Sequence, residues 1–85
     1  MNCIYSLRSE NLTHLGGRMG TEYTYDNWIK YFSDKEYASQ YANKDYNKGK
    51  KKKIELEWID EKDDNYRTED LGYVMYYINK IKVEK

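Results

Sequence analysis

The residues best suited to nucleophilic chemistry are one cysteine, Cys3, and one histidine, His14. A thiol nucleophile needs a base held against it, and a third group usually orients that base. Nothing in the sequence brings Cys3 and His14 together, and no third residue is indicated. We therefore expect no catalytic residues, and we expect that the protein is not an enzyme.

Two further motifs resemble ligand sites without completing one. The segment Gly16 to Thr21 is glycine-rich, but it lacks the lysine before the hydroxyl residue that a nucleotide-binding loop requires. A second group of residues is acidic, namely Asp60, Glu61, Asp63 and Asp64. Lys62 interrupts this group, and the central glycine and final glutamate of a calcium loop are absent. We expect a flexible connection and a charged turn, with no metal ion and no cofactor.

The charge pattern is the feature that indicates binding. Residues 44–53 hold six lysines against one aspartate, a net charge of +5, whereas residues 55–64 hold six acids against one lysine, a net of -5. Ammonium groups beside aromatic rings are what a protein needs to bind single-stranded RNA, because the lysines meet phosphates and the rings stack on bases. The predicted RNA-binding residues are Lys48, Lys50, Lys51, Lys52, Lys53, Tyr46 and Trp58, with Tyr41 as a further candidate ring. The alternative is that the lysines only solubilise a loop or meet acids of a neighbouring molecule, and that the tyrosines belong to the core.

Composition limits the molecule that carries this pattern. A chain of 85 residues has room for a single domain, residues 1–85, with a thin core. The mean hydropathy of -1.17 is low for a folded chain. Eleven tyrosines, two tryptophans and one phenylalanine nevertheless supply apolar surface for a core. The net charge is zero, no apolar run is long enough to span a membrane, and a lone cysteine suits a reducing compartment. We expect a soluble cytoplasmic protein without a membrane partner.

In the first half of the chain, the sequence predicts a strand over 3–8, a loop over 9–20 and an extended segment over 21–32, interrupted at Asp26-Asn27. The next segment, Ser33 to Glu36, has the form of a capping box with Ser33 as the N-cap. A helix is predicted over 34–44, with Tyr37, Ala38, Tyr41 and Ala42 at helical spacing.

In the second half, alternation of Ile54, Leu56 and Trp58 with glutamates predicts a strand over 53–59, followed by a charged turn over 60–65. Residues 69–83 fit two structures: a helix with one apolar face, or a strand rich in β-branched and aromatic residues. Gly72 disfavours the helix, and we favour a strand paired with 53–59 as a long hairpin. The fold class is therefore α+β, a small antiparallel sheet of three or four strands with one helix packed on one face.

The chain has no proline and is rich in lysine, asparagine and tyrosine. Together with the segments 31–42 and 70–81, this composition suggests a resemblance to known proteins. The chain resembles the small accessory proteins of T-even and related phages, and it is similar to the phage inhibitors of the ToxN endoribonuclease. The resemblance implies an antagonist of host defence that acts together with RNA in the host cytoplasm. It aligns no functional motif, so it assigns no residue.

Two functions are expected from these features. The first is a non-enzymatic antagonist of a host toxin or defence nuclease, which binds RNA through the lysines and occludes its target. The alternative is a protein-only inhibitor, of the anti-restriction or anti-CRISPR type, that docks its acidic turn or tyrosine-rich sheet on a basic host protein. A third possibility is an oligomer formed through a free edge of the last strand.

Overall fold

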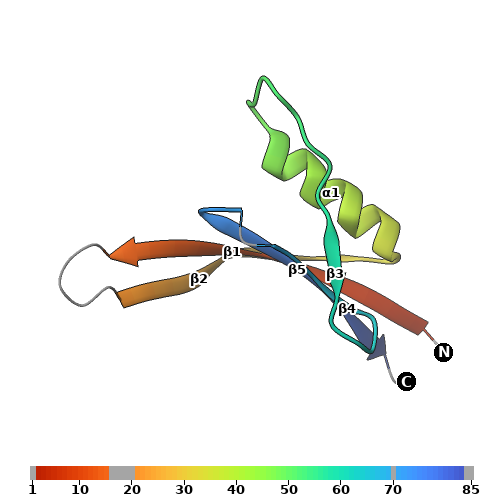
Figure 1. Ribbon diagram of the computed structural model, residues 1–85. Helices are drawn as coiled ribbons and strands as arrows, with labels where there is room; N and C mark the ends of the chain where they lie inside the picture. The colour runs from red at the N-terminus through yellow and green to blue at the C-terminus, as the bar shows by residue number, and fades with distance from the viewer. Residues whose placement is uncertain (1, 16–20, 70, 84–85) are drawn as a thin grey trace.

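The computed structural model describes residues 2–15, 21–69 and 71–83, which form an antiparallel sheet with one helix against one of its faces (Figure 1). Five strands make up the sheet, in the order β2-β1-β5-β4-β3. In the chain, the elements are β1 (Asn2–Leu15), β2 (Thr21–Phe32), α1 (Lys35–Asn47), β3 (Trp58–Asp60), β4 (Asn65–Thr68) and β5 (Val74–Val83). The predicted α+β class is confirmed, with five strands in place of three or four.

β1 and β2 form a long antiparallel hairpin. The predicted strand over 3–8 is part of β1, but the loop predicted from Ser9 is wrong as far as Leu15, because this polar stretch continues the strand. Ser9 is buried, and its hydroxyl oxygen accepts a hydrogen bond from the Asn27 side-chain amide at 3.2 Å. β2 agrees with the predicted extended segment, and its expected interruption is a bulge that leaves Asn27 out of the pairing. The glycine-rich stretch 16–20 lies outside the described residues.

The last segment is a strand, as favoured, and it lies inside the sheet. β5 pairs with β1 on one side and with β4 on the other. The predicted hairpin between 53–59 and the last strand is therefore wrong, and the edge of the last strand on which an oligomer was to form is covered by β4 over residues 77–79. β4 was not predicted, since its four residues directly follow a charged turn. Asp70 lies outside the described part of the chain.

The helix begins one residue later than the capping box indicated. The carbonyl of Asp34 accepts the first helical hydrogen bond, from the Ala38 amide, and Asp34 Oδ1 accepts from the Glu36 amide at 2.7 Å. Asp34 is therefore the N-cap in place of Ser33. Both residue types cap well, and an aspartate also places negative charge at the positive end of the helix dipole.

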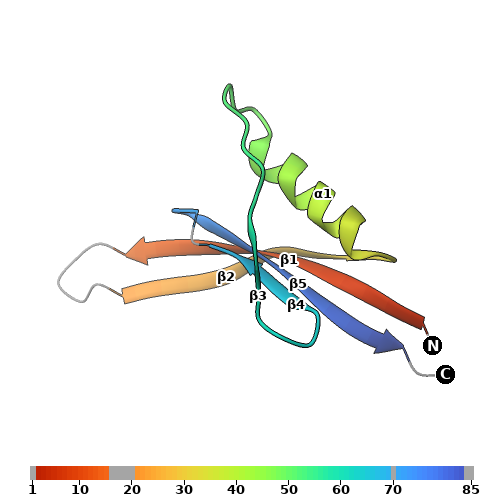
Figure 2. The same cartoon turned by 45° about the vertical axis from the view of Figure 1, so that its right-hand side comes forward.

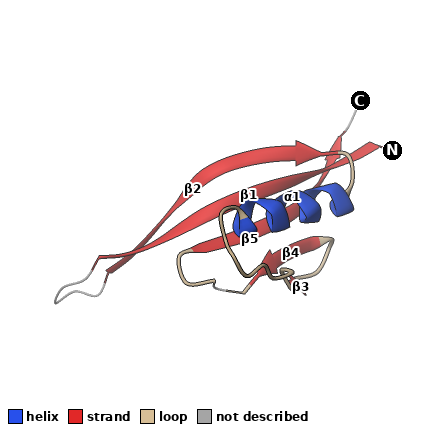
Figure 3. Cartoon of the chain, turned by 90° about the horizontal axis from the view of Figure 1, so that it is seen from above, coloured by secondary structure: helices blue, strands red, loops and turns tan. Residues whose placement is uncertain are grey.

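The helix lies over one face of the sheet (Figure 3), and a small core joins the two. Ala38 and Ala42 are fully buried, and their small side chains let α1 lie close to Leu7 of β1 and to β5. Tyr76 is buried in β5, and its hydroxyl donates to Asp45 Oδ2 of the helix at 2.7 Å. Burial first, and then this hydrogen bond, raise the pKa of the Tyr76 phenol.

The chain between the helix and β3 is extended, but residues 53–57 belong to no strand, so most of the strand predicted there is wrong. Its backbone groups bond instead to two asparagines of α1. Asn47 donates to the Ile54 carbonyl at 2.7 Å and accepts from the Ile54 amide at 2.9 Å, while Asn43 Oδ1 accepts from the Leu56 amide at 2.7 Å. Side-chain amides thus provide the partners that a neighbouring strand would have provided.

The second face of the sheet is covered by no described element. Its centre is a polar cluster, in which the Arg8 guanidinium lies 4.2 Å from the centroid of the Tyr77 ring and pairs with Glu10 and Asp26 at 3.3 and 3.2 Å. The Tyr77 hydroxyl donates to Glu10, and burial followed by the nearby Glu10 charge raises the pKa of this phenol. We call this surface the open face.

Candidate nucleic-acid interface

The predicted lysines surround the C-terminal end of α1. Four of them, Lys48, Lys51, Lys52 and Lys53, have exposed side chains, as does Lys44, which was not among the predicted residues. We call these five lysines the basic cluster. Lys44 and Lys48 lie one helical turn apart, and the other three follow in the connection to Ile54. No described acid forms an ion pair with any of the five. The described acids that do form ion pairs form them with Arg8, Arg67 and Lys80.

Four of the six acids that follow the lysines in sequence lie at the β3–β4 turn, in another part of the molecule, whereas Glu55 and Glu57 are exposed on the extended segment and form no ion pair with a described lysine. Residues 54–60 run from the lysine-bearing connection down to the sheet, so this connection and the β3–β4 turn lie at opposite ends of the molecule (Figures 1 and 2). In that turn, Glu61 pairs with Arg67 at 2.9 Å, and Asp64 pairs with Lys80 at 3.0 Å. The hydrogen bond from Lys80 holds the pKa of Asp64 below its ordinary value of 3.8. Separation in space therefore leaves the positive charge of the basic cluster uncompensated by this turn.

Lys50 has a different environment from the basic cluster. Its ammonium group donates to the Tyr46 carbonyl at 2.6 Å and to the Tyr73 hydroxyl at 2.8 Å, and it lies 3.8 Å from the centroid of the Tyr46 ring. The two tyrosine rings are stacked, with centroids 6.3 Å apart and an angle of 21° between their planes. A cation is well stabilised where it contacts both the negative end of a helix and two aromatic rings. Lys50 and Tyr46 thus attach the start of the connection to the residue before β5.

The predicted aromatic residues do not form a free stacking surface beside the lysines. One face of Tyr46 is occupied by Tyr73, and Lys50 also contacts its ring. Trp58 packs against the core from β3, beyond the extended segment, and its indole nitrogen is buried without a partner among the described residues. Tyr41 is the candidate ring that remains partly exposed, at 36%.

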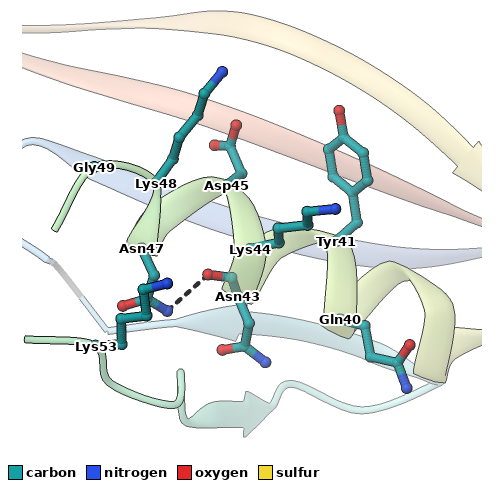
Figure 4. A pocket seen from close by; sticks show the side chains of 9 residues that line it. All are labelled: Gln40, Tyr41, Asn43, Lys44, Asp45, Asn47, Lys48, Gly49 and Lys53. Atoms are coloured by element: carbon teal, nitrogen blue, oxygen red, sulfur yellow. Dashed lines mark hydrogen bonds between the residues drawn. The ribbon is translucent and has the colours of Figure 1, made fainter. Parts of the chain in front are cut away.

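A hollow of about 820 Å³ lies over the exposed side of α1, and Tyr41, Lys44, Lys48 and Lys53 contribute to its lining (Figure 4). The same lining includes Asn43 and Asn47, whose amides are already bonded to the extended segment, and one acid, Asp45. Three ammonium groups around a shallow open surface are suited to a bound polyanion. Over residues 2–15, 21–69 and 71–83, no three His, Cys, Asp or Glu side chains gather as metal ligands.

Sequence reasoning identified the lysines of the connection but omitted Lys44 and Tyr37 from the candidate residues. Tyr37 is 58% exposed on α1. The signal that would have found both is the helical spacing of positions 37, 41, 44 and 48, which places these residues on one side of the predicted helix.

No family model, curated protein or solved structure matches this chain. Within the described part of the chain, no helix combines the length and the apolar composition needed to cross a membrane.

Proposed function

We propose that this protein binds RNA through the basic cluster and that it acts by occlusion, without making or breaking a covalent bond. The observation that supports this is the absence of an ion pair between the five exposed lysines and any described acid. Like charges held close together on one surface repel one another. A bound polyphosphate backbone relieves that repulsion and releases its own condensed counterions.

The number of lysines sets how strongly binding depends on salt. For a single strand, the logarithm of the binding constant falls with the logarithm of the salt concentration by about 0.7 for each neutralised phosphate. If each lysine of the basic cluster neutralises one phosphate, the slope is about -3.5. Replacing Lys51, Lys52 and Lys53 by glutamine leaves two lysines and lowers the magnitude of the slope to about 1.4.

The wider role that we propose follows the resemblance to phage accessory proteins. The protein acts in the cytoplasm of a phage host as an antagonist of an endoribonuclease toxin or another defence nuclease. RNA held on the basic cluster would take part in the complex and block access to the target. The support for this role is the resemblance together with the uncompensated lysines.

The test compares two variants of equal net charge. Lys52→Glu reverses one charge within the basic cluster, and Lys82→Glu reverses one exposed charge on β5, outside that cluster. We expect Lys52→Glu to weaken binding of a labelled oligoadenylate in fluorescence anisotropy several-fold more than Lys82→Glu does. Lys50 is left unchanged, because its ammonium group holds the connection in place. Equal effects of the two reversals would refute RNA binding at this site.

The open face favours a second candidate function, direct docking on a host protein. Tyr31 and Ile29 of β2 are 61% and 46% exposed there, and both are residue types that contribute contact area at interfaces. Affinity purification from infected cells, with and without ribonuclease, separates the two functions. A partner lost on RNA digestion supports the first function, and a partner retained after digestion supports the second.

A further inference from the structure

The exposed side of α1 carries tyrosines and lysines in one line. Tyr37, Tyr41, Lys44 and Lys48 follow one another at spacings of four, three and four residues, which places them on the same side of a helix. The buried Ala38 and Ala42 lie about 100° around the helix from Tyr37 and Tyr41, so this side borders the buried one. The line spans about 16 Å, since a helix rises about 1.5 Å per residue. We call these four residues the helix ridge.

The two tyrosines of the helix ridge are held differently. Tyr41 meets the Trp28 ring edge-on, with centroids 5.5 Å apart and an angle of 85° between the planes, and the Phe32 ring centroid is also 5.5 Å away. The ammonium group of Lys30 lies 5.6 Å from the centroid of the Tyr41 ring. The Tyr37 side chain, in contrast, has no hydrogen bond and no ring contact to another residue of the described chain. One ring is therefore fixed in orientation by its neighbours, and the other is open to a ligand.

The cationic part of the helix ridge continues into the basic cluster. Lys44 and Lys48 belong to both, and Lys53 lines the same hollow as they do (Figure 4). Asp45 is the acid of that lining, and its carboxylate accepts the hydrogen bond from the buried Tyr76 hydroxyl. The surface thus begins with two aromatic rings and ends with ammonium groups.

We infer that the helix ridge binds a single strand, with its phosphates on Lys44, Lys48 and the loop lysines and a base stacked on the open ring of Tyr37. This inference rests on the proposed function and specifies its ligand class. Stacking on a protein ring requires an unpaired base with a free face, which the interior of a duplex does not offer. Among the RNA ligands of the proposed function, the ligand is therefore a single strand, in place of a duplex or a simple polyanion.

The experiment compares two tyrosines of similar exposure. Tyr37→Ala removes an aromatic ring from the helix ridge, and Tyr31→Ala removes one from the open face, where 61% of the residue is exposed. Alanine is a good helix former, so Tyr37→Ala leaves α1 intact, which circular dichroism verifies. The probes are a labelled oligoadenylate, the same strand in a complete duplex, and inorganic polyphosphate, which carries charge without bases.

Loss of one base–ring stack corresponds to about 5- to 150-fold in affinity. We expect Tyr37→Ala to weaken oligoadenylate binding by at least about five-fold while its polyphosphate binding stays within about two-fold of the wild type. Tyr31→Ala should match the wild type with every probe. The wild-type protein should bind the single strand more tightly than the duplex.

Equal binding of single strand and duplex, or oligoadenylate binding by Tyr37→Ala within about two-fold of the wild type, overturns the stacking inference. If the stacking inference fails but Lys52→Glu still weakens binding more than Lys82→Glu does, RNA binding by the basic cluster stands without base stacking. If Lys52→Glu has no greater effect than Lys82→Glu, both proposals fail. The lysine and tyrosine variants therefore report separately on the site and on its ligand.

Discussion

Substituting Asn47 by alanine tests whether side-chain amides hold the extended segment that leaves the basic cluster. Asn47 is 8% exposed and makes two hydrogen bonds to the backbone of Ile54, one as donor and one as acceptor. Its side-chain amide also donates to the Asn43 carbonyl at 2.7 Å. A typical hydrogen bond contributes about 0.5–1.5 kcal/mol net, so the three contribute about 1.5–4.5 kcal/mol. Alanine regains about 0.5 kcal/mol through its better helix propensity. We expect the free energy of unfolding to fall by about 1–4 kcal/mol.

Urea denaturation followed by tryptophan fluorescence measures the total loss, and amide hydrogen exchange locates it. The Ile54 amide should exchange much faster in Asn47→Ala, because its acceptor is gone. In Asn43→Ala, the Leu56 amide should respond instead. Gln40→Ala, a change at an exposed position of the same helix, serves as the control. Unchanged exchange at Ile54 in Asn47→Ala would refute the assignment, because the amide would then have another acceptor.

Two further predictions concern other contacts of the helix. Lys50→Met removes the ammonium group between two tyrosine rings, so we expect faster amide exchange over residues 49–53 and a lower RNA affinity; unchanged exchange would contradict this role. Tyr76→Phe loses a hydrogen bond to Asp45, and we expect a stability loss on the order of 1 kcal/mol at neutral pH. The wild type should lose stability as the pH rises above 10.0, the ordinary tyrosine pKa, because the unfolded phenol releases a proton that the native one retains. Tyr76→Phe should show a shallower alkaline decline in urea titrations, and an equal slope would contradict that reasoning.

Local patterns predicted the elements whose hydrogen bonds are local. The helix followed from the spacing of Ala38 and Ala42, and its cap was misplaced by one residue because Ser33 and Asp34 are both good caps. Residues 53–57 show the limit of such patterns. Their alternation fits any extended chain with one buried face, and it contains no information on whether Asn47 or another strand receives the backbone hydrogen bonds.

The candidate site was predictable in composition but not in geometry. Lysine content identified the connection between helix and sheet, yet sequence alone could not separate Lys50, which is bonded internally, from Lys52, which is exposed. The nearby acids looked equally able to neutralise the lysines. Only the path of the extended segment shows that the acidic turn lies at the other end of the molecule (Figure 1).

The position of β5 between β1 and β4 has a consequence for how the molecule assembles. Leu7 of β1 pairs directly with Ile78 of β5, so the sheet surface that packs against the helix is complete only when β5 has paired with β1. During synthesis, the β1–β2 hairpin and α1 emerge before β5, which supplies Val74, Tyr76 and Ile78 to the core that also contains Ala38 and Ala42. Closing so large a loop is entropically costly and slows folding. The core between helix and sheet therefore cannot form completely before β5 has paired with β1.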